Sequence, residues 1–331
     1  MDYTNLLDRF MENKAKQFNI NIIGPYDKSS YSFDKPQIED ISENLIKRSD
    51  FLNSIRWVYV NQEQGAKIYG PLKPNVTGRQ DAARHIIEQI DNEQGYRVYE
   101  TDSGVTVKWG LLDNFSQHPE KFDHLLDEFV LDQIAANIMQ IGWAGKSLAA
   151  NTQAIDLSDV NKGWLALLAE QKPENIKATG KNGKLKIFGE NADYENLDTL
   201  ALALRNQLDE HHRNRNDLVF LVGAGLLARE AQPITSANPP AQEKTGLQNH
   251  YIANQFGGMK TLTPPQFPIY GAVVTTLQNL SLYIFNRSGR YSIRQDQDYK
   301  REIVSYWRYE GYVIEDLGLM AAIDPAMVIL G

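Results

Sequence analysis

The feature that most constrains this chain is a long segment, residues 61–95, with repeated glycine and proline and little hydrophobic periodicity. Only a short patch around residues 82–90 has helical spacing, while residues 55–60 before the segment have the composition of a strand. A connection longer than about 15 residues with little structure of its own is unusual inside a compact domain. Such segments are normally functional, disordered, or ordered by something outside the subunit. We therefore expect an excursion that leaves the core.

The composition of the whole chain is that of an ordinary soluble globular protein. Its 331 residues are 42% hydrophobic and 23% charged, which allows a real core and two or three subdomains. The net charge of -8 and the dispersed basic residues argue against a protein whose function is to bind nucleic-acid phosphates. The absence of cysteine excludes disulfides, thiolate zinc sites and cysteine nucleophiles, and it fits a reducing cytoplasm.

No segment has the pattern of an export signal or a membrane span. Residues 1–5 carry an acidic side chain where a signal peptide needs a basic region, and no apolar region follows. The longest apolar stretch, residues 218–228, is shorter than the about 20 residues that a spanning helix needs. We therefore expect synthesis in the cytoplasm and no membrane partner.

Helical and strand-like patterns are mixed along the chain, which predicts an α+β fold. The clearest helix is expected over residues 119–141, where an apolar stripe would extend for about 34 Å. Two amphipathic helices, in the first 20 residues and from Pro36, are joined by a polar connector and suggest an arm. Asn196 is expected to cap a further helix. Strands are expected at 55–60, 96–100, 105–109, 218–222, 272–276, 280–285, 290–293, 302–308, 311–314 and 326–330, the second and third forming a hairpin that turns at residues 102–104.

The histidines give no metal-binding pattern. His118 and His124 flank the start of the long helix, where a solvated acidic face is the simpler interpretation. His211 and His212 are adjacent and would point to different faces of a helix, so we do not expect them to share an ion. We therefore predict no metal site, and no cofactor site or catalytic constellation was found either.

A glycine turn, Gly223-Ala224-Gly225, lies between an apolar strand and a short helix expected at residues 226–230. It matches only half of a dinucleotide-binding turn, because Ala228 stands where the third glycine belongs. Short glycine turns usually serve packing alone. Nucleotide binding is therefore kept only as an alternative.

Aromatic residues cluster on the strands that flank the excursion. They could stack on nucleic-acid bases, but the acidic balance of the chain disfavours this. A protein interface suits them better, because large aromatic side chains supply much of the energy of protein contacts. The candidate subunit-interface residues are Trp57, Tyr59, Gly65, Lys67, Tyr69, Arg79, Tyr96, Tyr99 and Trp109.

Stretches along nearly the whole chain resemble the peduovirus-type major capsid proteins. The most distinctive is Asp-Val-Asn-Lys-Gly-Trp-Leu at residues 159–165, and residues 277–283 resemble the family's Asn-Leu-Ser-Ile-Tyr strand. Residues 110–115 keep only part of the family's Leu-Asp-x-Trp pattern, and the N-terminus is not clearly similar. The remaining stretches are 49–52, 141–145, 193–198, 217–223 with 226–228, and 312–316.

The resemblance implies the Hong Kong 97 type phage capsid fold. It implies an N-terminal arm at residues 1–54 and an E-loop hairpin at 55–112 that lies over a neighbouring subunit. A peripheral domain at 113–193 would contain the spine helix at 119–141. An axial domain would follow at 194–290, and residues 291–331 would return to the peripheral domain.

The same resemblance implies a major capsid protein, a non-enzyme that assembles with itself into pentamers and hexamers. These would form an icosahedral head around double-stranded DNA, bound without sequence specificity, in the bacterial host cytoplasm. A portal protein and a scaffold or protease are implied partners, with a decoration protein as a further candidate; a chain beginning at Met1 is expected to be untrimmed. Two alternatives are an encapsulin-like cellular compartment and, from another class, a nucleotide-dependent enzyme; a tail-tube component is weaker.

Overall fold

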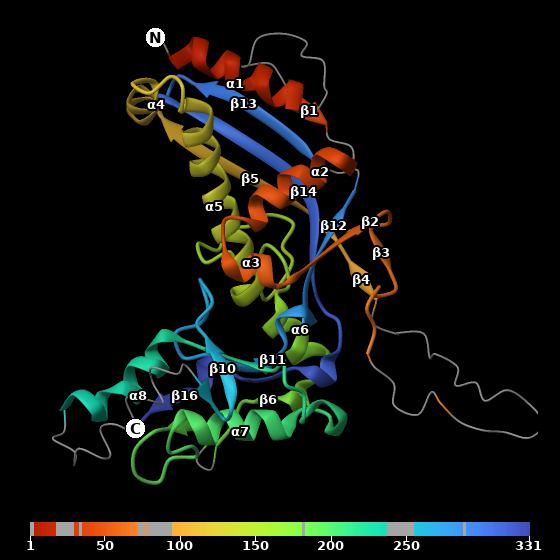
Figure 1. The fold of residues 1–331 in the computed structure, drawn as a ribbon, viewed down its shortest axis with the longest axis vertical. Helices are drawn as coiled ribbons and strands as arrows, with labels where there is room; N and C mark the ends of the chain where they lie inside the picture. Colours follow the sequence, from red (N-terminus) through yellow and green to blue (C-terminus); the bar gives the residue numbers. More distant parts are fainter. Residues whose placement is uncertain are drawn as a thin grey trace, which may run out of the picture. The chain divides into compact units, whose positions relative to one another are not determined.

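A computed structural model describes residues 3–17, 30–32, 35–71, 77, 95–180, 183–236, 255–286 and 289–331 (Figure 1). The chain divides into two compact units, each assembled from stretches that are far apart in sequence. Unit 1 contains Met1–Gly65, Arg97–Met139 and Leu282–Gly311, and unit 2 contains Ala66–Tyr96, Gln140–Ser281 and Tyr312–Gly331. The mixed helix and strand content agrees with the predicted α+β class.

Unit 1 is built on a six-stranded sheet. The strand order is β1-β13-β14-β12-β2, and β5 also pairs with β14. β14 is antiparallel to both β13 and β5. The bounds are β1 Ser30–Ser32, β2 Arg56–Val60, β5 Tyr99–Lys108, β12 Leu280–Phe285, β13 Arg290–Asp296 and β14 Arg301–Ile314.

The hairpin expected to turn at residues 102–104 is wrong, because β5 runs through them as one strand. Alternate residues of β5 are buried, including Ser103 at 9% exposure. Ser103 Oγ accepts a hydrogen bond of 2.8 Å from the guanidinium of Arg308, which in turn donates to the buried carboxylate of Glu310 (2.7 Å). The buried guanidinium of Arg308 therefore needs a hydroxyl group on the strand. The Asp-Ser-Gly sequence supplies this hydroxyl and does not form a turn.

β14 is likewise one strand where two were expected on either side of residue 310. Gly311 lies inside it, and a Cβ added there would lie 2.2 Å from the backbone oxygen of Arg97. The glycine therefore permits close approach of two backbones and does not end the strand.

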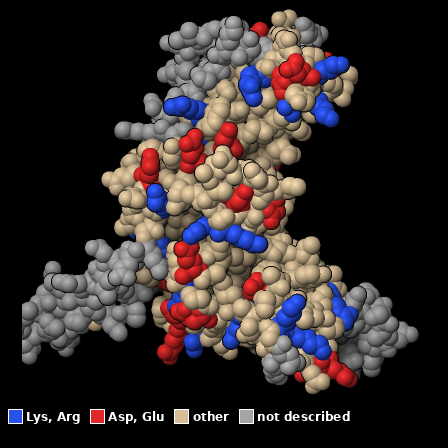
Figure 2. All heavy atoms as spheres, turned by 180° about the vertical axis from the view of Figure 1, so that it is seen from behind, with Lys and Arg blue, Asp and Glu red and all other residues tan. Residues whose placement is uncertain are grey.

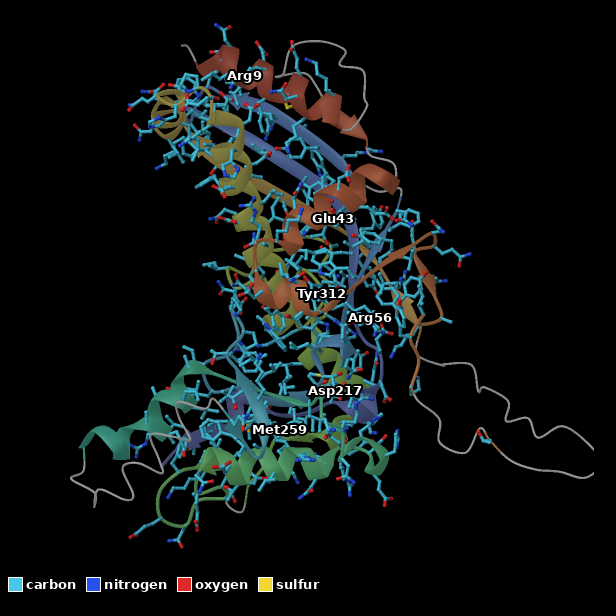
Figure 3. The ribbon with its side chains drawn as sticks, in the orientation of Figure 1. Arg9, Glu43, Arg56, Asp217, Met259 and Tyr312 are labelled. Carbon is cyan, nitrogen blue, oxygen red and sulfur yellow. The ribbon has the colours of Figure 1, made fainter. Side chains whose placement is uncertain are left out.

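Among the described residues, five α-helices belong to unit 1. They are α1 Tyr3–Gln17, α2 Lys35–Ile46, α3 Asp50–Ser54, α4 Trp109–Ser116 and α5 Phe122–Ala144, of which the last five residues are assigned to unit 2. α5 is the predicted long helix, displaced by three residues. α1 buries Leu7 and Phe10 completely. Lys14 of α1 forms an ion pair with Asp127 of α5 (2.7 Å), and Arg9 lies near Asp123 (3.4 Å; Figure 3). The first helix of the expected arm is therefore packed into its own unit.

Unit 2 contains a second six-stranded sheet, in the order β6-β15-β11-β8-β10-β9, and the pair β16-β7. β8 is parallel to β10 and antiparallel to β11, and all four of its residues are buried, as predicted for residues 218–222. The bounds are β6 Ile176–Lys177, β7 Leu185–Ile187, β8 Val219–Val222, β9 Gln255–Phe256, β10 Met259–Leu262, β11 Ala272–Thr275, β15 Ala321–Ile323 and β16 Val328–Leu330.

The core of unit 2 lies between this sheet and α7 (Leu197–Gln207). Leu200 and Leu204 of α7 are fully buried against residues of β8, β10 and β11, among them Phe220 and Met259 (Figure 3). Asn196 caps α7 as predicted, because its Oδ1 accepts a 2.8 Å hydrogen bond from the Thr199 N–H. The other helices are α6 Trp164–Gln171, α8 Ala224–Ser236, and the 3₁₀ turns η2 Pro173–Asn175, η3 Glu210–His212, η4 Leu277–Asn279, η5 Leu317–Leu319 and η6 Pro325–Met327.

The two ends of the predicted excursion pair with each other. β3 (Gln64–Gly65) and β4 (Tyr96–Arg97) form a two-stranded sheet, and the Val98 N–H donates to the backbone oxygen of Glu63 (2.9 Å). Residues 72–76 and 78–94, with the helical patch expected at 82–90, lie outside the described residues.

Candidate interaction surfaces

The glycine turn at the start of α8 is used for packing. A Cβ on Gly223 would lie 2.2 Å from the backbone oxygen of Ile269. The N–H of Gly223 donates to Gly271 (2.9 Å), and the N–H of Gly225 donates to Ile269 (3.1 Å). A phosphate-binding turn needs such amides to point at the ligand. The amides of this turn are therefore already hydrogen-bonded to residues 269 and 271. The helix α8 is also longer than the short helix expected at residues 226–230.

The adjacent histidines do not diverge, so the expectation that they face apart is wrong. The rings of His211 and His212 lie 3.9 Å apart between centroids. The helix-face argument fails because η3 is a single 3₁₀ turn of three residues. His212 is buried, and its Nε2 lies 2.8 Å from Oδ2 of Asp316. By contrast, His118 and His124 are exposed at the start of α5.

Three of the aromatic residues predicted at an interface make hydrogen bonds or are buried within their own subunit. The indole N–H of Trp57 donates to the backbone oxygen of Leu52 (2.9 Å). The indole N–H of Trp109 donates to the buried carboxylate of Glu302 (3.3 Å). Tyr96 is buried at 8% exposure. Their contribution to contacts between copies stays a prediction, but each already has a structural role within the chain.

The other candidates differ in accessibility. Tyr59 is half-buried, and burial raises its pKa although a hydrogen bond with Ser42 opposes the shift. The guanidinium of Arg97 lies over the ring of half-buried Tyr99, 5.2 Å from its centroid. Gly65 is half-buried in β3, and Arg79 lies outside the described residues.

Lys67 anchors the start of the excursion within unit 2. Its ammonium group donates to the backbone oxygen of Ile314 (2.7 Å). Burial lowers the pKa of Lys67, and the nearby carboxylates of Glu315 and Asp316 oppose this shift. The two residues that follow, Ile68 and Tyr69, are 55% and 47% exposed. The exposed residues that this segment offers to a neighbouring copy therefore begin directly after Lys67, whose side chain is held by its hydrogen bond to Ile314.

The most distinctive sequence stretch forms a tight junction of glycine and tryptophan in unit 2. Trp164 is fully buried, and its indole N–H donates to the backbone oxygen of Ser281 (3.2 Å). Its ring makes edge contacts with Trp143 and Tyr312 at centroid distances of 4.8 and 5.3 Å (Figure 3 labels Tyr312). A Cβ on Gly142 would lie only 2.4 Å from the Trp164 ring. Packing around Trp164 therefore accounts for Gly142, Trp143 and Trp164, which lie in two of the stretches that carried the resemblance.

The loop before this junction presents a hydrophobic residue that the sequence reasoning missed. Ile155 is 99% exposed at the tip of a turn closed by a hydrogen bond from the Leu157 N–H to Ala154 (3.0 Å). The carboxylate of Asp159 accepts from the Gln153 and Ala154 N–H groups (2.7 and 3.0 Å), which lowers the pKa of Asp159. A lone isoleucine among polar residues produces no periodicity, so no sequence signal marked it.

Beside this loop, unit 2 has an apolar pocket of about 530 Å³. Its wall includes α6 and the segment around η6, and Asp156, the neighbour of Ile155, contributes to its lining. Ala166, Ala169 and Ile323 are typical of its mainly apolar lining. Unit 2 therefore has an exposed apolar side chain, Ile155, beside an apolar pocket.

Among the described residues, the face of the molecule seen in Figure 2 has no patch of a single charge. On the face shown in Figure 2, the basic and acidic side chains of the described residues are interspersed. This agrees with the dispersed basic residues of the sequence. In addition, none of the described helices is both long and apolar enough to cross a membrane.

Comparison with known proteins identifies the family. The model of the family described as "Phage major capsid protein, P2 family" matches residues 6–326. The chain belongs to the P2 family of phage major capsid proteins. The major capsid protein of Serratia phage KSP20 is 26% identical over 341 residues, covering 96% of this chain and 95% of the relative. The capsid proteins of Escherichia phage P2 are 24% identical over 337 residues, covering 97% and 94%.

A solved structure gives the same fold. A chain from the procapsid of satellite phage P4, which includes the size determination (Sid) protein, matches with a TM-score of 0.75 at 20% identity, covering 98% of each chain. The Hong Kong 97 type capsid fold is therefore confirmed, as is the resemblance to this capsid family. The encapsulin and nucleotide-enzyme alternatives are not favoured. As a P2-family major capsid protein, the chain is a shell component that assembles with copies of itself.

Proposed function

We propose that this capsid protein assembles as pentamers and hexamers into a closed icosahedral head around double-stranded DNA in the host cytoplasm, without catalysing a reaction. The family match over residues 6–326 carries the proposal. The net charge of -8 and the interspersed charge on the face shown in Figure 2 support DNA enclosure without sequence-specific binding. A portal protein, a scaffold or protease and a decoration protein are the proposed partners.

The proposed roles of the segments follow the family. Residues 1–54 would act as an N-terminal arm, 55–112 as the E-loop, 113–193 and 291–331 as the peripheral domain, and 194–290 as the axial domain. The pairing of β3 with β4 and the Lys67 bond to Ile314 support an excursion whose base is fixed. Its remaining residues would then contact a neighbouring copy.

We assign a second contact between copies to Ile155 and the adjoining pocket of unit 2. Closed rings require two different complementary surfaces on each subunit. A fully exposed isoleucine is unremarkable by itself, but here its turn is held by three backbone N–H groups. Little conformational entropy would be lost when this turn is buried against a second copy.

Negative-stain electron microscopy of the purified chain, expressed alone and with a candidate scaffold, tests the general proposal. We expect closed shells of uniform diameter. Particles from phage-producing cells should contain DNA and one portal vertex. A chain that forms no particles in any of these preparations, or particles that carry a cellular enzyme as cargo, would contradict the proposal.

Two variants test the assigned contacts against matched controls. Ile155→Asp should reduce particle yield at least tenfold while the subunit keeps its melting temperature, whereas Thr152→Asp on the same exposed loop should assemble normally. Deleting residues 70–94, which keeps Lys67 and β4, should leave a folded subunit that cannot close shells. Normal particles from either variant would refute the corresponding contact.

A further inference from the structure

Three side chains with metal-binding atoms gather in unit 2, apart from the surfaces assigned above. His211 and His212 come from η3, and Asp316 lies two residues after β14, as the N-cap of η5. One possible ligand atom of each lies within 4.8 Å of the others. The histidines are 104 residues or more from Asp316 in sequence, so the fold itself brings them together.

The bonding of His212 leaves one ring nitrogen unused. Asp316 is an acceptor here: its Oδ1 receives the Gly318 N–H (2.9 Å), and its Oδ2 lies 2.8 Å from Nε2 of His212. Nε2 must then carry the proton, and in the neutral ring Nδ1 carries a lone pair. Within the described part of the chain, buried Nδ1 has no hydrogen-bond partner. A buried polar atom without a partner costs stability unless something else satisfies it.

We propose that His211 and His212 bind a divalent transition-metal ion of the Zn²⁺ class, with Nδ1 of His212 as one ligand atom. In this arrangement Asp316 accepts the Nε2–H and so holds His212 in the tautomer that binds metal, as carboxylates commonly do beside metal-bound histidines. His211 is exposed, which gives the ion a route from solvent. Ligand distances of about 2.0–2.1 Å require the His211 ring to reorient so that one of its nitrogens faces the ion bound at Nδ1 of His212.

The surrounding charges decide which ions fit. Arg215 and Lys67 both interact electrostatically with Asp316, and Arg215 also forms an ion pair with Asp217 (2.6 Å). These cations reduce the negative field, so a hard ion such as Mg²⁺ gains little here. The affinity must come from imidazole lone pairs, which favour Zn²⁺, Ni²⁺ and Cu²⁺ over Mg²⁺ and Ca²⁺.

Titration calorimetry of the untagged full-length chain, after treatment with a chelator, tests this site. We expect Zn²⁺ to bind and to raise the melting temperature, and Mg²⁺ to do neither. His211→Ala should weaken Zn²⁺ binding at least tenfold without loss of fold, because the side chain is exposed, while the control His124→Ala should bind as the parent does. Asp316→Asn should weaken binding about 10- to 100-fold, as expected for a group that orients a ligand.

Co²⁺ replaces Zn²⁺ as a spectroscopic probe for the same variants. A visible absorption band that disappears in His211→Ala and persists in His124→Ala would support two histidine ligands. Unchanged Zn²⁺ affinity in His211→Ala, equal binding of Mg²⁺, or no Zn²⁺ binding by the parent chain at millimolar concentration would overturn the proposal.

Discussion

Replacing Gly142 by alanine isolates the packing at the glycine–tryptophan junction. Two effects oppose each other. Alanine is about 1 kcal/mol better than glycine in the interior of a helix such as α5. However, the added Cβ would lie 2.4 Å from the Trp164 ring, and overpacking of a buried site typically costs about 1–3 kcal/mol.

The surroundings of Trp164 place the cost at the upper end of that range. The ring is fully buried, contacts Trp143 and Tyr312 at its edges, and is held by its bond to Ser281. It cannot move aside without breaking these contacts. A cost of about 3 kcal/mol less a gain of about 1 gives a net loss of about 2 kcal/mol in the free energy of unfolding.

A double-mutant cycle provides the assay, measured by urea unfolding of the unassembled subunit. In a Trp164→Phe background the outer ring atoms that meet the Cβ are gone, so Gly142→Ala should no longer destabilise and should recover the helix gain of about 1 kcal/mol. Gly110→Ala in α4 is the matched control, because a Cβ there meets nothing within 4 Å. A coupling energy below about 0.5 kcal/mol between positions 142 and 164 would refute the reasoning.

Three further predictions concern single groups. Trp109→Phe should lower the free energy of unfolding by about 1–3 kcal/mol, because buried Glu302 loses its indole donor; an unchanged urea midpoint with reduced particle yield would instead favour a purely interfacial role. Burial raises the pKa of Tyr306 to about 12. The neutral phenol therefore contributes about 2–3 kcal/mol to the free energy of unfolding below pH 10, and this contribution is lost as pH rises toward 12. Tyr306→Phe should reduce this alkaline loss of stability in urea titrations, whereas Tyr299→Phe, at an exposed position, should not. The lowered pKa of Asp159 means that its stabilisation of the turn is present above the ordinary value of 3.8 and lost as pH falls through the lower folded value. The protection of the Gln153 and Ala154 amides, taken relative to the intrinsic exchange rate at each pH, should therefore fall in acid, and in Asp159→Asn it should already be low at neutral pH.

Local patterns predicted much of the secondary structure correctly. The apolar stripe of α5, the Asn196 cap of α7 and the apolar run of β8 are all confirmed, because each depends on residues close in sequence. The hairpin at residues 102–104 failed for the opposite reason. Its local turn signal is overridden by Arg308, a partner 205 residues away that sequence spacing does not reveal.

The interaction surfaces were harder to predict than the fold. Trp57 and Trp109 looked suited to an interface, but an indole also suits an internal hydrogen bond, and the sequence does not distinguish the two. Ile155 belongs to no periodic pattern, and its exposure follows from a turn set by Asp159. The proximity of His211 and His212 to Asp316 is a property of unit 2 as a whole.

The pairing of β5 with β14 also sets the order of events during synthesis. Ser103 cannot bond to Arg308 until that residue has been made, and at about 5–20 residues per second the sequence separation of 205 residues corresponds to about 10–40 s of translation. Unit 1 contains the beginning of the chain, yet its sheet cannot be completed until residue 311 has been made. The apolar face of α1, with Leu7 and Phe10, is made before Ser103 and therefore exists for longer than that interval before its sheet does. A segment that is made long before its sheet can form is a natural substrate for chaperones, and the folding yield of this chain should depend on them more than its final stability does.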